Sequence, residues 1–153
     1  TNNATCRLPQ EKEESMRKYK FRGKGIADNE WYFGDLIQTR LGTTWIITED
    51  YTTATEEISL NTCASPQVKA ETVGQYTGLH DKNGKEIYEG DIVKVRRYSS
   101  FEIEVVKFDK GCFYAGMHYG SSTRSTVKLI QPKLTEVIGN IYENKELLNE
   151  TNR

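Results

Sequence analysis

Four carboxylates near the middle of the chain, Asp81, Glu86, Glu89 and Asp91, are the first residues that could do chemistry. Closely spaced carboxylates could act as a general acid and base, or could bind a divalent cation. Asp81 opens the turn sequence DKNG, where its side chain is expected to accept hydrogen bonds from nearby backbone amides, and Asp91 starts an apolar run. Acids that flank turns are common, so we interpret the four as structural and predict no metal site.

The histidines and cysteines form no familiar catalytic pattern. Cys6, Cys63 and Cys112 are widely spaced and include no C-x-x-C pair, so we interpret them as free thiols. An imidazolium beside a thiol lowers the thiol pKa, and Cys112 with His118 is the one such pairing to consider. A glycine between these two interrupts the strand that would hold them on one face, and His80 is far away in the sequence. We therefore predict a protein that is not an enzyme and needs no cofactor.

A group of basic and aromatic residues after residue 90 gives the clearest binding signal. Lys94 and Arg96 are two residues apart, so they lie on one face of a strand. Cations interleaved with aromatic rings are typical of surfaces that bind single-stranded nucleic acid, although outward Lys and Arg are also found as solvated faces and as protection of sheet edges. The predicted partner- or nucleic-acid-binding residues are Lys94, Arg96, Arg97, Tyr98, Tyr114 and Arg124, with Lys107 and Tyr119 nearby.

The net charge is −1, but the charges fall in blocks. Residues 16–27 carry five basic residues and no acid, whereas residues 28–62 carry seven acids against Arg40 alone. Complementary blocks could pair between subunits, and the edge strands of a small β-protein invite such pairing. A homo-oligomer is therefore a second interpretation, beside binding to an unidentified protein. Nucleic acid stays a less favoured partner.

Short runs of β-branched and aromatic residues, separated by turn sequences, predict a mainly β chain. The first run, residues 18–22, alternates strictly, so we expect Tyr19 and Phe21 to be buried and the basic side chains to face outward. Residues 53–63 are either a short helix or a loop, and Asn144 is expected to cap a helical turn through residue 148. Further strands are expected at residues 31–40, 43–48, 73–77, 91–97, 101–108, 112–117, 126–130 and 137–142.

The chain length of 153 residues allows one domain with a small appendage. Residues 1–15 are polar without periodicity, and we predict a disordered or non-native leader before a start at Met16. We expect an N-terminal β-rich region over residues 16–70 and a barrel region with a tail over residues 71–153. No window approaches the roughly 20 apolar residues of a membrane span, so we expect a cytoplasmic protein without membrane contact.

Three motifs, together with RKYKFR at residues 17–22, carry a family resemblance: QYTGL at residues 75–79, DKNGKEIYEGDIV at residues 81–93 and VIGNIYEN at residues 137–144. In these motifs the chain resembles the YopX-like family of phage and prophage proteins. The resemblance implies a β fold with an SH3-like barrel, carriage on temperate phages of low-GC Gram-positive bacteria, and no established activity. The chain departs from the family in having Lys145 where a proline is common, and in a variable linker between residues 40 and 73.

Together these observations predict a mainly β chain, with a small SH3-like barrel or roll, an N-terminal β-meander and a short C-terminal helical turn. The expected function is that of an accessory phage protein acting in the bacterial host cell by interaction with an unidentified phage or host protein, or by self-association, rather than by catalysis. The alternative is a nucleic-acid-binding module that uses the basic and aromatic strand face.

Overall fold

The computed structural model describes residues 18–48, 65–97, 99–116 and 130–149. The predicted leader, the ambiguous segment at residues 53–63, Tyr98 and most of the predicted strand at residues 126–130 lie outside these ranges. The strands are β1 (Phe21–Lys24), β2 (Trp31–Gln38), β3 (Thr44–Thr48), β4 (Gly74–His80), β5 (Glu86–Tyr88), β6 (Asp91–Arg97), β7 (Ser100–Asp109), β8 (Cys112–Ala115) and β9 (Thr135–Asn140). The described ranges also contain the short 3₁₀ helices η2 (Ala70–Thr72), η3 (Pro132–Leu134) and η4 (Lys145–Leu148).

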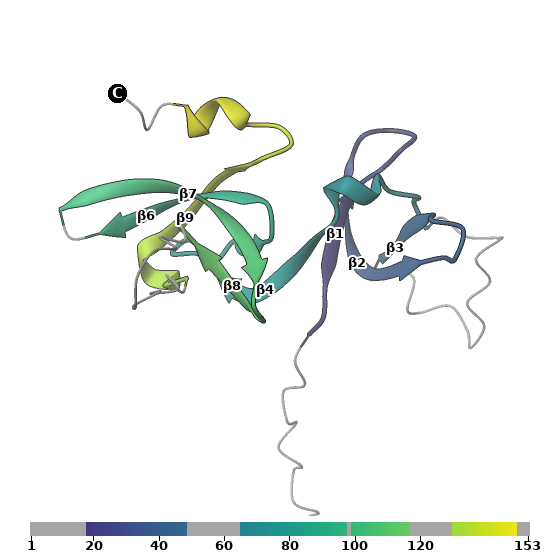
Figure 1. Ribbon diagram of the computed structural model, residues 1–153, viewed down its shortest axis with the longest axis horizontal. Helices are drawn as coiled ribbons and strands as arrows, with labels where there is room; N and C mark the ends of the chain where they lie inside the picture. Colours follow the sequence, from purple (N-terminus) through teal and green to yellow (C-terminus); the bar gives the residue numbers. More distant parts are fainter. Residues whose placement is uncertain (1–17, 49–64, 98, 117–129, 150–153) are drawn as a thin grey trace, which may run out of the picture.

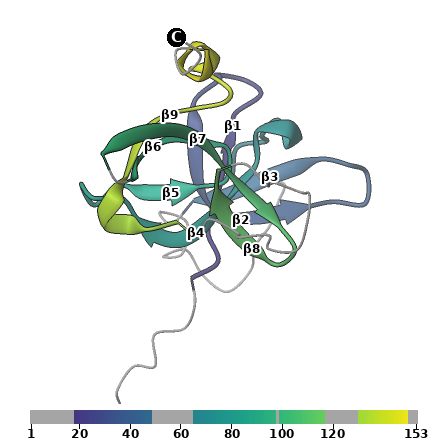
Figure 2. The same ribbon diagram turned by 60° about the vertical axis from the view of Figure 1, so that its left-hand side comes forward.

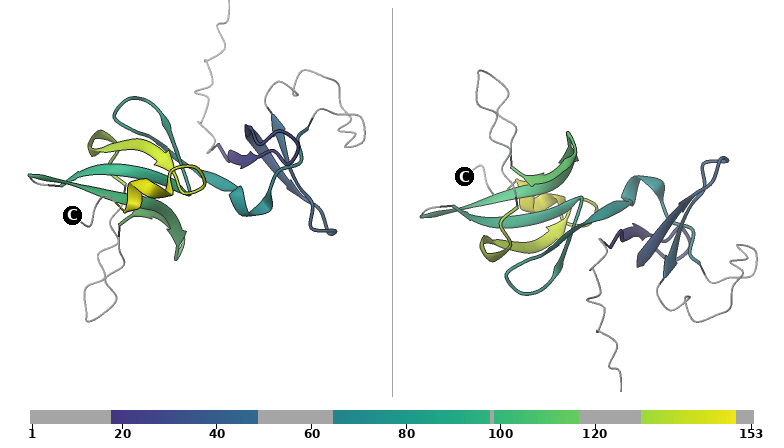
Figure 3. Two further views of the ribbon diagram at one scale, coloured as in Figure 1. Left: turned by 90° about the horizontal axis from the view of Figure 1, so that it is seen from above. Right: turned by 90° about the horizontal axis from the view of Figure 1, so that it is seen from below.

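The described strands form two antiparallel sheets, with the orders β3-β2-β1-β4-β5 and β8-β7-β6-β9. Strand β4 passes between the group β1–β3 and the group β6–β9, which lie side by side (Figures 1 and 3). The prediction of a mainly β chain is confirmed, but the described strands do not close into one barrel. The first sheet continues across residue 70, because β1 pairs with β4 through Phe21 opposite Gln75 and Arg22 opposite Gly74. The predicted boundary there stays a prediction.

The face of the first strand is opposite to the one predicted. Tyr19 is 62% exposed and precedes β1, whereas Arg22 in the middle of β1 is only 7% exposed. Alternation in the sequence identifies two faces but not which of them is buried. Here the side of β1 that carries Arg22 is buried, because acidic side chains from other parts of the chain form ion pairs with its basic residues.

Turn chemistry explains the boundaries that were predicted correctly. Lys110 and Gly111 both have positive φ angles, of 50° and 83°, as a two-residue type I′ hairpin turn requires, and Asp109 pairs with Cys112 across it. Gly84 adopts the left-handed conformation with a φ of 84° and closes the turn between β4 and β5.

Three details of the predicted elements differ from the structure. Strand β5 was missed, because three residues between two turns are too few to show alternation. Ile130, from the predicted strand at residues 126–130, is buried but lies outside any strand. The predicted helical turn is present as η4, but the Asn144 side chain makes no capping bond; its Oδ1 instead accepts a hydrogen bond from the amide of Asn140 at 3.2 Å.

One hydrophobic cluster joins the two sheets. Ile87 of β5, from the first sheet, packs with residues of all four strands of the second sheet. Figure 2 shows the course of β5 and of these strands. Burial of such side chains contributes about 1.5–3 kcal/mol each. The cluster consists of Ile87, Val93, Val95, Val106, Ala115, Ile130 and Val137, with Leu79 and Phe113 packed against it.

The buried side chain of Asp81 fastens the β4–β5 turn to β9. Its Oδ1 accepts hydrogen bonds from the amides of Asn83 and Lys85 at 2.8 and 2.9 Å, as its predicted role in the turn requires. Its Oδ2 accepts one from the amide of Val137 at 2.9 Å, and the amide of Lys82 donates to the carbonyl of Thr135. Burial raises the pKa of Asp81, but the three amides together outweigh it and leave the pKa below its ordinary value. The turn therefore covers the outer edge of β9, which is otherwise open to pairing.

Replacing Asp81 with alanine removes the acceptor of three backbone amides. We expect the free energy of unfolding to fall by about 3 kcal/mol, because a hydrogen bond to a charged group contributes roughly 1.5–3 kcal/mol and such losses are not additive. Urea denaturation followed by tryptophan fluorescence measures the change. Asp35→Ala, which removes an exposed carboxylate from β2, is the control and is expected to stay within about 0.5 kcal/mol of the wild type. Equal losses in the two variants would contradict this role of Asp81.

Candidate functional site

The outer face of the four-stranded sheet gathers part of the predicted binding group. Val93, Val95 and Val106 point into the core, so the residues that alternate with them lie on the opposite face. The register places Lys94 opposite Ile103, Arg96 opposite Phe101 and Lys107 opposite Tyr114. We call this surface the basic face, formed by Lys94, Arg96, Phe101, Ile103, Lys107 and Tyr114.

The basic face combines cations with exposed apolar surface. Arg96 and Lys107 are exposed, and Phe101 is 57% exposed. Lys94 Nζ lies 4.6 Å from the centroid of the Phe101 ring, a cation–π contact. A shallow groove beside it is lined by Ile103, Val105, Tyr114 and Leu148, with Glu104, Lys107 and Gly116. The face therefore offers both charge and apolar contact area.

The structure brings together only some of the predicted residues. Lys94, Arg96 and Tyr114 share the basic face, but Tyr114 is only 8% exposed, so its ring is not a stacking platform. Arg97 is the last residue of β6, opposite Ser100. Tyr98, Arg124 and Tyr119 lie outside the described residues. The assignment of these residues to a binding site stays a prediction.

Cys112 and His80, the described members of the candidate thiol and imidazole groups, have different partners. Cys112 Sγ donates to the carbonyl of Asp109 at 3.5 Å, and His118 lies outside the described residues. His80 Nδ1 is 3.2 Å from the hydroxyl of Tyr76. Within the described ranges, no three His, Cys, Asp or Glu side chains are grouped as a metal ion would require.

A cluster that the sequence did not reveal connects β1 to the rest of the chain. Three alternate cations, the first just before β1 and the other two within it, each bind an acid at a short N–O distance: Lys20 with Glu86 at 3.1 Å, Arg22 with Asp91 at 2.6 Å, and Lys24 with Glu143 at 2.8 Å. We call these three ion pairs the β1 ladder. Glu86, Asp91 and Glu143 come from β5, β6 and the turn after β9. The basic first strand, which we expected to be free for contacts between subunits, therefore binds acids of its own chain.

Arg22 and Asp91 form the central, buried pair of the β1 ladder. Asp91 is 1% exposed, and the Arg22 guanidinium lies between the rings of Trp31 and Tyr88, with its Cζ 4.9 and 5.0 Å from their centroids. Arg22 Nη2 donates to the carbonyl of Glu89 at 3.2 Å, and Asp91 Oδ2 accepts from the amide of Tyr88 at 2.8 Å. Burial raises the pKa of Asp91, and the nearby guanidinium only partly offsets that rise.

The outer two pairs of the β1 ladder also combine an acid with an aromatic ring. Lys20 Nζ lies 6.0 Å from the centroid of Phe33, and Lys24 Nζ lies 5.8 Å from that of Trp31. The only sequence signal for this arrangement is the repeat of Lys20, Arg22 and Lys24 at every second position. A single sequence does not show which acids these cations meet, because the partners are about 66 to 119 residues away.

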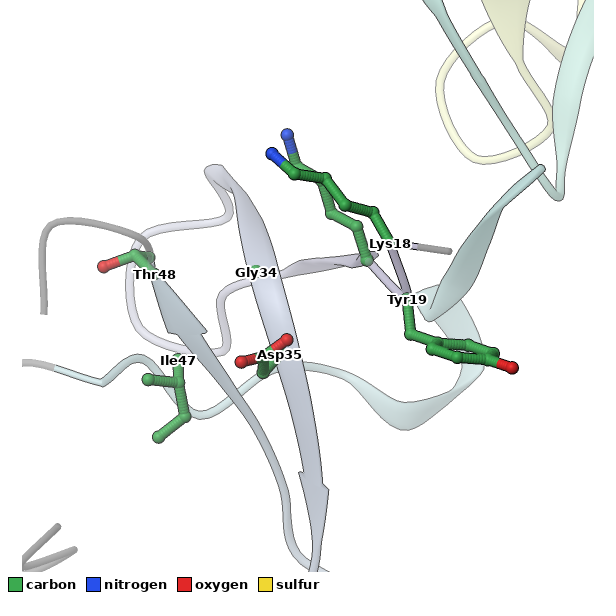
Figure 4. A pocket seen from close by; sticks show the side chains of 7 residues that line it. Lys18, Tyr19, Gly34, Asp35, Ile47 and Thr48 are labelled. Atoms are coloured by element: carbon green, nitrogen blue, oxygen red, sulfur yellow. The ribbon is translucent and has the colours of Figure 1, made fainter. Parts of the chain in front are cut away.

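A small pocket lies where the chain enters β1 (Figure 4). It is lined by Lys18, Tyr19 and Lys20 on one side and by Gly34, Asp35, Ile47 and Thr48 of β2 and β3 on the other. In Figure 4 the Tyr19 ring and the Lys18 amine extend in different directions. The side chains do not converge on a common point, so the pocket favours no class of ligand.

A double-mutant cycle with Arg22→Met and Asp91→Asn tests the buried pair. Each single change is expected to lower the free energy of unfolding by about 3–5 kcal/mol, because it leaves one buried partner uncompensated. The double variant is expected to lose clearly less stability than the sum of the two single losses. Urea denaturation gives the coupling energy. The exposed pair Lys82–Glu136, with an N–O distance of 2.6 Å, is the matched control; Lys82→Met with Glu136→Gln is expected to give a coupling of about 1 kcal/mol or less. Equal coupling in the two pairs would count against a special role for Arg22.

The Lys24–Glu143 pair predicts a dependence of stability on acid pH. Hydrogen bonds from Lys24 and then Asn140 lower the pKa of Glu143 from 4.5 to about 2. A carboxylate whose pKa is lower in the folded state stabilises that state above its unfolded pKa, and this contribution is lost as the pH falls from about 4.5 to about 2. Glu143→Gln is therefore expected to be less stable than the wild type at pH 7 and to lose less on acidification. Urea denaturation midpoints measured across this pH range give the change in stability of each variant. Glu146→Gln on η4 is the control for the loss of one charge. Parallel curves of stability against pH for the wild type and Glu143→Gln would refute this role of Glu143.

No helix among the described residues is long and apolar enough to cross a membrane.

Comparison with known proteins places the chain in a family. The model of the YopX protein family matches residues 20–149, and no curated protein matches the chain. Among solved structures, the crystal structure of protein EF1440 from Enterococcus faecalis is similar, with 24% identity, a TM-score of 0.45 and coverage of 86% of this chain and 98% of that chain. Because the family match extends over most of the sequence and includes β1, the β4–β5 turn and β9, this chain belongs to the YopX protein family.

Proposed function

We propose that this chain is a phage or prophage accessory protein that works in the host cytoplasm by binding another protein through the basic face, and not by catalysis. The observation that carries the proposal is the exposed Phe101 ring beside Arg96 and Lys94, next to a partly apolar groove. Aromatic residues and arginine are enriched in protein interfaces and supply much of their binding energy. The SH3-like barrel implied by the family resemblance is part of the same proposal, since such barrels commonly serve as binding modules.

Nucleic acid is the second candidate for this face. It is favoured by Lys94, Arg96 and Lys107, which lie on one side of the sheet and could contact successive phosphates. Sequence-tolerant binding of single strands usually combines such cations with several stacking rings. Among the described residues of the basic face, Phe101 is exposed while Tyr114 is largely covered, so a protein partner fits the surface better.

A double charge reversal on the basic face tests the proposal. The variant R96E/K107E is expected to recover at least about tenfold less of a discrete partner protein from phage-infected cells than the wild type does, because two contacts worth about 1 kcal/mol each are turned into repulsion. Quantitative mass spectrometry of nuclease-treated affinity pull-downs measures the recovery. The control K110E/K133E reverses two exposed charges elsewhere and is expected to recover the partner normally.

The same experiment separates the two partner classes. Equal recovery by wild type and R96E/K107E would refute the basic face as the contact surface. Recovery that disappears after nuclease treatment would instead favour nucleic acid. In that case a labelled single-stranded oligonucleotide should bind with a salt dependence of slope about −2, as three neutralised phosphates imply.

A further inference from the structure

We propose that a second copy of this chain binds to the basic face, and that it does so through the turn at residues 26–30 between β1 and β2. This inference rests on the proposed function and names one partner for the same face. It differs from the pairing expected from the sequence, because the basic residues of β1 are held in the β1 ladder and the basic surface comes from β6, β7 and β8 instead.

The turn at residues 26–30 carries the complementary chemistry. Asp28 and Glu30 are exposed acids, and Ile26 is 53% exposed beside them. The basic face offers the complementary set: the exposed Arg96 lies opposite the exposed ring of Phe101, Lys94 Nζ lies 4.6 Å from the centroid of that ring, and the exposed Lys107 lies farther along β7. An apolar contact surrounded by opposite charges is the usual composition of a specific interface.

The turn is held in one conformation, which lowers the entropic cost of docking. Asp28 Oδ2 accepts a hydrogen bond from the Tyr32 hydroxyl at 2.5 Å, and Oδ1 accepts one from the amide of Glu30 at 3.1 Å. These bonds lower the pKa of Asp28, so its carboxylate stays ionised. The amide of Ile26 donates to the carbonyl of Gln67 and that of Gly25 to the carbonyl of Glu30, which fix the turn at both ends.

The two surfaces lie on different parts of the molecule. The turn at residues 26–30 closes the β1–β2 hairpin, whereas the far end of the β6–β7 hairpin points away from β2 and β3 (Figure 1). Two different surfaces that meet in a head-to-tail contact are heterologous, so each copy can bind one neighbour at each surface. The product is a closed ring or an open chain of copies, depending on the angle between neighbours.

A charge-swap experiment tests this contact. R96E/K107E makes the basic face acidic, and D28K/E30K makes the turn basic. Sedimentation velocity of each purified chain is expected to show association for the wild type, and association weaker by at least about tenfold for each variant alone. An equimolar mixture of the two variants is expected to associate again, because each acidic surface then meets a basic one. E30K alone keeps the hydrogen bonds of Asp28 and serves as a second variant in case D28K/E30K is unstable; circular dichroism checks that every variant folds.

The outcomes separate this inference from the proposed function. A wild-type chain that stays monomeric up to about 1 mM, or a mixture that associates no better than its components, overturns the head-to-tail contact. The proposed function then still stands if R96E/K107E loses its partner in the pull-down while D28K/E30K keeps it. Loss of self-association in K110E/K133E as well would show that net charge alone is responsible, and would also overturn the inference.

Discussion

The buried pair of Arg22 and Asp91 is the contact on which the arrangement of the two sheets depends. A charge with so little exposure has lost its hydration, and only its partner and the surrounding hydrogen bonds compensate for that loss. Arg22 therefore helps to specify where β1 lies, since this position gives the guanidinium a carboxylate, a carbonyl oxygen and two aromatic faces. Asp91 equally fixes the start of β6, because its second oxygen binds the amide of Tyr88. The pair selects one geometry more than it adds stability.

Other polar and backbone contacts fix the edges of the two sheets. The Asp81 turn closes the outer edge of β9, and residues 65–68 lie along the outer edge of β3, where the amide of Val68 donates to the carbonyl of Thr44. Gly74 lies against the carbonyl of Glu89, so a side chain there would push β4 away from the start of β6. Backbone edges that would otherwise invite unwanted pairing are thereby occupied.

Local signals in the sequence predicted the local structure well. The hairpin around Lys110 and Gly111 and the strands from β6 to β8 depend on turn residues and alternation that a single sequence shows directly. The buried face of β1 and the short β5 were missed, because both depend on partners distant in the sequence. The candidate site likewise depends on both local and distant signals. The spacing of Lys94 and Arg96 correctly placed them on one face, but the burial of the Tyr114 ring follows from tertiary packing that local spacing does not show.

The long sequence separation within the β1 ladder affects how the chain can fold as it leaves the ribosome. β1 is synthesised before its acids at residues 86, 91 and 143. Contacts between such distant residues carry a large loop-closure cost and slow folding. The β1–β3 meander can pair locally, but its cations stay hydrated until these acids have emerged. The last contact between β1 and the rest of the chain, Lys24 with Glu143, can consequently form only after β9 has been synthesised.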